Sequence, residues 1–365
     1  MRPVFFLLCL ACGPSLAAAP AAPTSSAATI RLSSGPSEPW IERLPDRQDI
    51  NFEIFIDNGT GLALEIAAVE LSAYDAQDRL LLQRLIDGNG IRPSVQTVPQ
   101  RALAAGERLT LFNPFPSLAA SLPLARLHYL VRLESADGKQ EFAGELDVHP
   151  RARVTRSALR LPLRGRLINY DGHDFLAHHR RFDYTFAPIA QLGFKSNFMR
   201  YAYDFVPVKA DGAMHRGSGS ANDDYFGFGA ELLADGDGVV VAVVEDRADD
   251  RHFDQSEIAS NPMALFGNYL VIDHGNGEFS VYGHLKQGSV RPVLGQHLRQ
   301  GELVAQIGAS GSALFPHLHY ELQDGPDTRA EGLPSYFSDI RVWLGGVSRM
   351  RKLGTVDTGE IVEAK

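Results

Sequence analysis

Two histidines near the C-terminal end, His317 and His319, stand two residues apart in the apolar–polar alternation HLHYEL of residues 317–322. This alternation predicts a β-strand, on which residues two apart point to the same face. Two adjacent imidazoles make a poor core because both ring nitrogens of each need partners, but they suit a divalent metal or a proton relay. An isolated pair of this kind is more often two solvated histidines on an exposed strand. Other residues of the chain are therefore needed to support a metal site or a proton relay.

The composition argues against several classes of function. The 365 residues are 44% hydrophobic and 22% charged, which is ordinary for a globular chain long enough for two domains. The net charge of −9 argues against a nucleic-acid partner and against broad attraction to anionic lipid. After the N-terminal apolar run no stretch is long and apolar enough to span a bilayer, so we expect no membrane span.

The N-terminus has the pattern of a secretory signal peptide. A charged n-region precedes an apolar run over residues 4–11, and small residues follow it. We expect residues 1–19 to be removed and the protein to be exported to the periplasm or cell envelope. Both cysteines, Cys9 and Cys12, lie in this segment, so we expect no disulfide in the mature chain. The residues before Cys12 are a weak lead-in for lipid attachment, and we expect cleavage rather than a lipid anchor.

Residues 29–150 alternate repeatedly between apolar and polar positions. The alternation is clear at residues 51–57, 67–74, 127–133 and 141–148. Short strands at this spacing predict an antiparallel β-sandwich, immunoglobulin-like in topology. This domain contains no paired carboxylates, metal-ligand spacing or nucleophile arrangement. We therefore expect it to position the rest of the chain or to dock another envelope protein.

The second half, residues 160–345, is also rich in predicted strands and in glycine, so the whole fold is expected to be mostly β. Strands are expected at residues 201–206, 238–245, 269–273, 280–283, 303–307 and 317–322. Polar insertions at residues 209–225 and 246–261 interrupt them, and loops of this length often form the walls of a site.

Three sequence features occur together in this half. GNYLVIDHG covers residues 267–275, YGHL covers residues 282–285, and SGSALFPHLHYEL covers residues 310–322. In this order they resemble the lysostaphin-type (M23) zinc metallopeptidase domain, over residues 190–323. The resemblance implies a β-rich metalloprotease fold, a Zn2+ cofactor and hydrolysis of peptide bonds in bacterial peptidoglycan, the cell-wall polymer.

The resemblance also assigns roles to four residues. It makes His319 and Asp204 metal ligands. It makes His317 a catalytic base or transition-state partner, and His284 a second catalytic histidine lining the site. Zinc with three protein ligands keeps one position for water, lowers the pKa of that water and polarises a carbonyl. A neighbouring imidazole can accept the water proton, and a donor such as His284 can stabilise a developing oxyanion.

One position departs from the family pattern. The family's HxxxD motif would place a ligand histidine four residues before Asp204, where this chain has Arg200. A guanidinium group has no lone pair for a cation, so Arg200 cannot be a ligand. The segment HHRRFD, residues 178–183, contains the same HxxxD spacing. Asp204 is preferred as the ligand because it is better placed before the glycine-rich stretch that follows.

Three outcomes are open at the metal site. A histidine from elsewhere, His178 or His179, could complete the ligand set. Alternatively, Asp204, His319 and water hold zinc weakly, or metal binding is lost. We expect a secreted zinc endopeptidase acting on peptidoglycan peptides. The competing hypothesis is a degenerate, non-catalytic domain that binds cell wall or regulates another envelope hydrolase.

Overall fold

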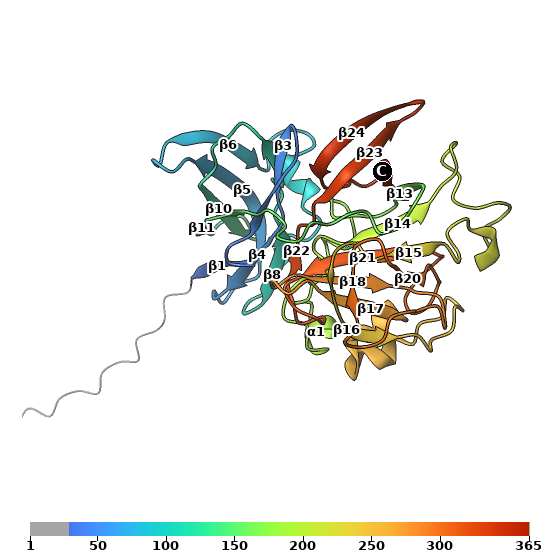
Figure 1. Cartoon of the computed structure of the whole chain (residues 1–365). Coiled ribbons are helices and arrows are strands. Elements are labelled where there is room, and N and C mark those ends of the chain that lie inside the picture. Colours follow the sequence, from blue (N-terminus) through green and yellow to red (C-terminus); the bar gives the residue numbers. More distant parts are fainter. Residues whose placement is uncertain (1–28, 365) are drawn as a thin grey trace, which may run out of the picture.

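The computed structural model describes residues 29–364, which fold mostly into β-strands, so the expected fold class is confirmed (Figure 1). The signal peptide predicted at residues 1–19 and Cys12 lie outside the described residues. The helical elements are short: α1 (Ala187–Ala190), η1 (Ser94–Thr97), η2 (Asn222–Asp224), η3 (Gln255–Ala259) and η4 (Pro262–Phe266). Within residues 29–364 no helix has the length and apolar character needed to cross a membrane.

The N-terminal part consists of three small sheets. Their strand orders are β1-β4-β8, then β11-β10-β5-β6 with β7 beside β5, and β12-β2-β3-β9. The strands are β1 (Ile30–Gly35), β2 (Trp40–Arg43), β3 (Arg47–Ile50), β4 (Glu53–Asn58), β5 (Leu64–Tyr74), β6 (Leu80–Ile86), β7 (Ala102–Leu103), β8 (Arg108–Phe112), β9 (Ser117–Ala119), β10 (Arg126–Ser135), β11 (Glu141–Val148) and β12 (Arg151–Ala152).

Alternating apolar residues build the core of this part. In β10 every second side chain is buried, including Leu127 and Val131. These side chains belong to the same hydrophobic cluster as Ile54 and Ile56 of β4, which lies in a different sheet. Sheets that share one core in this way form a sandwich. The immunoglobulin-like topology stays a prediction.

The C-terminal part is dominated by one large sheet. Its order is β19-β16-β17-β18-β21-β14-β13-β25-β23-β24, with β22 beside β21, while β15 and β20 pair separately. The strands are β13 (Arg166–Asn169), β14 (Tyr203–Pro207), β15 (Glu231–Leu233), β16 (Gly238–Val244), β17 (Tyr269–Asp273), β18 (Phe279–Gly283), β19 (His297–Leu298), β20 (Leu303–Gln306), β21 (Leu318–Gln323), β22 (Gly332–Leu333), β23 (Phe337–Leu344), β24 (Val347–Gly354) and β25 (Ile361–Ala364).

The strand that carries the HLH sequence lies inside this sheet. β21 pairs with β18 on one side and β14 on the other, and all six of its residues are buried. The sheet continues past residue 345, because β25 pairs with both β13 and β23. The histidine strand is therefore a rigid support for side chains that must keep fixed positions.

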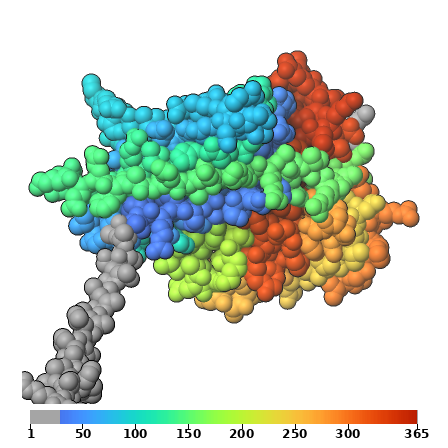
Figure 2. Space-filling model, turned by 90° about the vertical axis from the view of Figure 1, so that its left-hand side faces the viewer, coloured from blue at the N-terminus to red at the C-terminus, as the bar shows by residue number. Residues whose placement is uncertain are grey.

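The two parts of the chain pack directly against each other: in Figure 2 the blue surface borders red surface both below it and at the upper right. Arg200 lies at this contact with a fully buried side chain. It donates two hydrogen bonds to Glu53 of β4, at 2.5 and 2.9 Å, and one to Glu331 at 2.5 Å. Burial lowers the pKa of Arg200, but the two carboxylates outweigh burial and hold that pKa well above its usual value.

Replacing Arg200 tests how much its ion pairs with Glu53 and Glu331, the Arg200 cluster, contribute to the stability of the protein. Arg200→Met leaves Glu53 buried without its cation, so we expect the free energy of unfolding to fall by about 3–5 kcal/mol. Urea denaturation followed by circular dichroism measures the change. Arg349→Met on β24 is the matched control, because Arg349 is exposed. A loss no larger than that of the control would contradict the proposed strength of the cluster.

Candidate metal centre

Three neighbouring strands place three of the predicted site residues. Asp204 of β14 stands directly opposite His319 of β21, which in turn stands opposite Gly283, the last residue of β18. Residues opposite each other on adjacent strands share a face and lie within side-chain reach. His319 Nδ1 is accordingly 3.2 Å from Asp204 Oδ1, and His284 follows β18 at the same edge.

His317 stands directly before β21, because the strand begins one residue later than the sequence pattern predicted. The side chain still reaches the same place, with His317 Nε2 3.4 Å from Asp204 Oδ1. Its ring centroid lies 4.7 Å from that of His284. The structure therefore brings His317, His319, His284 and Asp204 together.

A fifth residue, His179, joins this group from the irregular segment 169–202. Its side chain is 1% exposed, and its Nε2 lies 3.5 Å from Asp204 Oδ1. One ligand atom from each of His179, Asp204 and His319 lies within 4.8 Å of the others, and all three residues are buried. Asn197 fixes the backbone here by donating to the carbonyls of His179 and Arg180, at 3.0 and 3.1 Å.

His178, the other alternative from the sequence, is placed differently. Its side chain is 63% exposed, and its Nδ1 pairs with Asp171 at 2.6 Å. Asp171, His178 and His179 form a second group with metal-ligand spacing, which shares His179 with the first. We give preference to the group with Asp204 and His319, because all of its members are buried and only one member of the second group is.

The hydrogen bonds of the histidine rings show which ring nitrogen carries the proton and which has a lone pair for a metal or a proton. His179 Nδ1 donates to the carbonyl of Gly172 at 3.0 Å, His284 Nδ1 to that of Ser310 at 2.9 Å, and His317 Nδ1 to that of Phe315 at 2.8 Å. A carbonyl only accepts, so each Nδ1 carries the proton. The Nε2 of each neutral ring then offers a lone pair.

The charge states also suit a cation. Burial raises the pKa of Asp204, but His179 and His317 outweigh burial and hold that pKa well below its usual value. Burial lowers the pKa of His179 to about 3 and the pKa of His284 well below its usual value. The cluster therefore offers an ionised carboxylate beside the neutral imidazoles of His179 and His284, the form in which these groups bind metals. His319 differs: burial lowers its pKa, but the hydrogen bonds to Asp204 and Glu321 outweigh burial and raise the pKa to about 9, so this ring must release a proton when it binds a metal.

The donor set fits zinc. Two imidazole nitrogens and one carboxylate oxygen are the hard and borderline ligands that zinc accepts, and three protein ligands leave a fourth position open. His319 Nε2 lies 3.2 Å from Glu321 Oε2, so Glu321 can orient that ring and leave Nδ1 toward Asp204. The sequence analysis missed Glu321, although the alternation through His317 and His319 puts it on the same face of the strand.

The cluster lies at the wall of a cavity of 390 Å³. Aromatic and apolar side chains line the remainder, among them Tyr170, Phe182, Phe266, Leu314 and Phe315. The two polar insertions expected from the sequence contribute indirectly. Tyr225, at the end of the first insertion, stacks on Phe315 at 5.5 Å between centroids, and Asn222 bonds to Asp249 of the second.

Comparison with known proteins finds a family that part of the chain matches. Residues 223–330, which include His284, His317 and His319, match the model of Peptidase family M23. The resemblance to the M23 peptidases is confirmed. The M23 region, as we call residues 223–330, does not include Asp204 or His179, which reach the cluster from the preceding residues.

Curated relatives match a part of the chain. The chain is 34% identical over 116 residues to the peptidoglycan DD-endopeptidase ShyA of Vibrio cholerae, covering 32% of this chain and 22% of that protein. It is 32% identical over 76 residues to the cell division protein DipM of Caulobacter vibrioides, covering 21% of this chain and 12% of that protein. The chain thus spans less than a quarter of the length of these relatives.

Solved structures resemble the chain at lower identity. A zinc-containing peptidase from Vibrio cholerae is 15% identical, with a TM-score of 0.26, over 78% of this chain and 80% of that one. The catalytic domain of lysostaphin from Staphylococcus simulans is 14% identical, with a TM-score of 0.25, over 46% of this chain and 88% of that one. TM-scores this low add nothing to the assignment of the site.

The ligand set can be tested by metal analysis. We expect the purified protein to hold about one zinc ion per chain, bound by Asp204, His319 and His179. His179→Ala and His319→Ala should each lower zinc affinity by more than about 100-fold, because the loss of a ligand costs more than the loss of an outer partner. Competition with a chromophoric chelator measures the affinity. His178→Ala is the matched control, and a loss of zinc from it as large as from His179→Ala would contradict the assignment.

Proposed function

We propose that the protein is an exported zinc endopeptidase that hydrolyses peptide bonds of bacterial peptidoglycan. One observation carries the proposal: ligand atoms of three buried residues converge beside two further histidines, His284 and His317, that line the same cavity. The match to Peptidase family M23 and the names of the curated relatives support the substrate class. The signal peptide expected at residues 1–19 supports export to the periplasm or cell envelope.

In the proposed reaction, His179, Asp204 and His319 would hold the metal. When bound there, zinc polarises the substrate carbonyl and lowers the pKa of a water molecule. His317 receives the proton of the attacking water on Nε2, which has a lone pair because the ring proton is on Nδ1 and donated to Phe315. The same ring then carries the proton to the nitrogen of the leaving amine, so the base becomes the acid of the second step.

The role of His284 follows from its hydrogen bond to Ser310. Because Nδ1 of His284 is the donor, its neutral Nε2 is an acceptor and can orient the attacking water through one of its hydrogens. The sequence analysis expected His284 to donate to a developing oxyanion. In this geometry the ring can do so only after it has taken up a proton, which burial opposes by lowering its pKa.

The non-catalytic alternative rested on Arg200, which fills the usual position of a ligand histidine. In the structure Arg200 binds Glu53 and Glu331 instead, while His179 approaches Asp204 from an earlier position in the segment 169–202. The domain therefore has a candidate third ligand. We propose that the N-terminal sheets, residues 29–150, serve the peptidase domain by holding this segment in place.

The two catalytic histidines can be separated from the ligands by experiment. We expect His317→Ala and His284→Ala to keep zinc and to lower kcat by about 10²–10⁴-fold, the usual contribution of a general acid–base group. Release of soluble muropeptides from purified peptidoglycan measures kcat, and metal analysis of the same samples measures zinc. A chelator should abolish hydrolysis by the wild type, and added zinc should restore it. Hydrolysis that persists in His317→Ala or under the chelator would contradict the proposal.

A further inference from the structure

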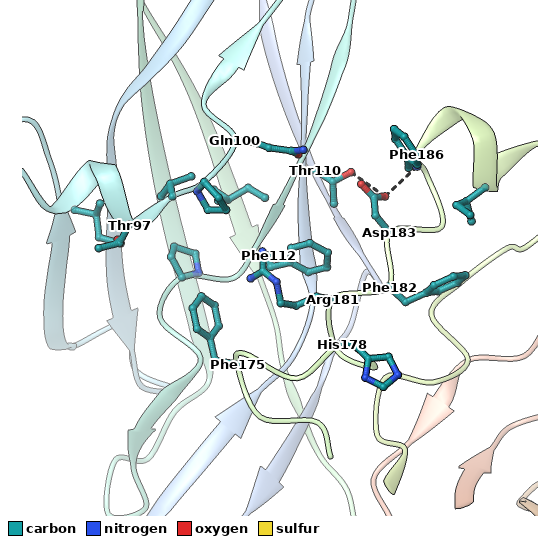
Figure 3. Close-up of a pocket in the computed structure, with 16 residues that line it drawn as sticks. Thr97, Gln100, Thr110, Phe112, Phe175, His178, Arg181, Phe182, Asp183 and Phe186 are labelled. Carbon is teal, nitrogen blue, oxygen red and sulfur yellow. Dashed lines mark hydrogen bonds between the residues drawn. The ribbon is translucent and has the colours of Figure 1, made fainter. Parts of the chain in front are cut away.

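A second cavity lies beside the metal centre, between the N-terminal sheets and the segment 169–202. Its volume is 610 Å³, and Figure 3 shows side chains from both parts of the chain around it. Two residues, His178 and Phe182, line this cavity and also the cavity of the metal centre. The two cavities are therefore neighbours that share a wall.

The walls of the second cavity are largely aromatic. Phe112 comes from β8, and Phe175, Phe182 and Phe186 come from the segment 169–202 (Figure 3). Thr97 and Gln100 add polar groups on the side of the N-terminal sheets, and both are exposed. Such walls offer packing surface for apolar side chains and a few hydrogen-bonding groups for peptide amides.

Arg181 is the feature that gives this cavity its chemistry. Its guanidinium carbon lies 4.8 Å from the ring centroid of Phe112 and 5.8 Å from that of Phe175, so two aromatic rings hold it (Figure 3). Among residues 29–364 no carboxylate forms an ion pair with it, although the chain carries a net charge of −9. A half-buried guanidinium group without a counter-ion is a ready partner for an anion.

Asp183, the carboxylate in the same cavity, is occupied elsewhere. Its Oδ1 accepts hydrogen bonds from the hydroxyls of Thr110 and Thr185, at 3.3 and 2.6 Å, and from the backbone N–H of Phe186 at 3.1 Å. These bonds fix Asp183 against β8 and the start of α1. Asp183 lines the same cavity but forms no ion pair with Arg181, so the guanidinium group can pair with a ligand.

We propose that this cavity is a substrate subsite, in which Arg181 binds a free carboxylate of the peptidoglycan peptide whose scissile bond lies at the metal centre. The inference rests on the proposed function and extends it to substrate selection. Every peptide ends in a carboxylate, and the planar guanidinium fork matches a carboxylate with two parallel hydrogen bonds. Because His178 and Phe182 line both cavities, a single peptide that contacts these two side chains can extend into both. An amidated peptide would lose the charge-assisted pair and bind more weakly.

The proposal can be tested by binding, without hydrolysis. The probes are two synthetic peptides of the sequence L-Ala-D-isoGln-L-Lys-D-Ala, one with a free C-terminal carboxylate and one with a C-terminal amide. Titration calorimetry on the full-length protein, with and without chelator, should show that the acid binds about 10-fold more tightly than the amide. Arg181→Gln should bind both peptides equally, while Arg181→Lys should keep part of the preference.

The controls separate this inference from folding and from the proposed activity. Arg349→Gln on β24 makes the same charge change away from the cavity and should keep the full preference. Thermal unfolding of each variant shows whether it is folded. If Arg181→Gln does not fold, Arg181→Lys still tests whether the guanidinium group is responsible for the preference. Equal binding of acid and amide by the wild type, or a preference retained in Arg181→Gln, would overturn the subsite. A wild type that prefers the acid but never releases wall fragments would overturn the proposed activity and leave the subsite standing.

Discussion

The burial of Arg200 is the constraint on which the arrangement of the two parts depends. A guanidinium group cannot be moved out of water without carboxylates to compensate it, and Glu53 and Glu331 supply them from opposite sides of the contact. Because Glu53 belongs to β4 of the N-terminal sheets, the C-terminal part cannot separate from those sheets without exposing or unpairing a charge. These ion pairs fix the contact between the two parts in one geometry, whereas a purely apolar contact would allow more than one orientation.

The same contact determines where the third candidate ligand can come from. Arg200 is turned toward Glu53 and supplies no ligand, and His179, from an earlier position in the segment 169–202, approaches Asp204 instead. The backbone around His179 is held by the N-terminal part: His173 pairs with Glu42 at 2.8 Å, and Arg180 donates to the carbonyl of Asn113 at 3.2 Å. The geometry of the metal centre therefore depends on sheets that contribute no ligand to it.

This dependence explains what the sequence could and could not predict. His317, His319 and His284 lie on or directly beside strands, where alternation and motif order locate them, and strand pairing then brings Asp204 opposite His319. His179 belongs to a segment with one short helix and no hydrophobic period, so sequence patterns left it equal with His178. Only tertiary packing, through Asn197 and Gly172, distinguishes the two. The partners of Arg200 lie 147 and 131 residues away, beyond any local pattern.

The backbone at His284 shows how strictly the structure fixes one of the proposed catalytic groups. Its φ angle is 59°, in the left-handed region that a residue with a Cβ adopts at a cost of about 1–2 kcal/mol. Three hydrogen bonds hold the residue there: its N–H donates to Phe266 at 2.7 Å, its carbonyl accepts from Gly308 at 2.9 Å, and its ring donates to Ser310. β18 ends at Gly283, directly before this residue, and the ring centroid of His284 lies 5.9 Å from that of His319. The fold keeps His284 in a left-handed conformation although this costs free energy, and the conformation holds the ring where the proposed reaction needs it. The strain is therefore stronger support for a functional role of His284 than the burial of its side chain.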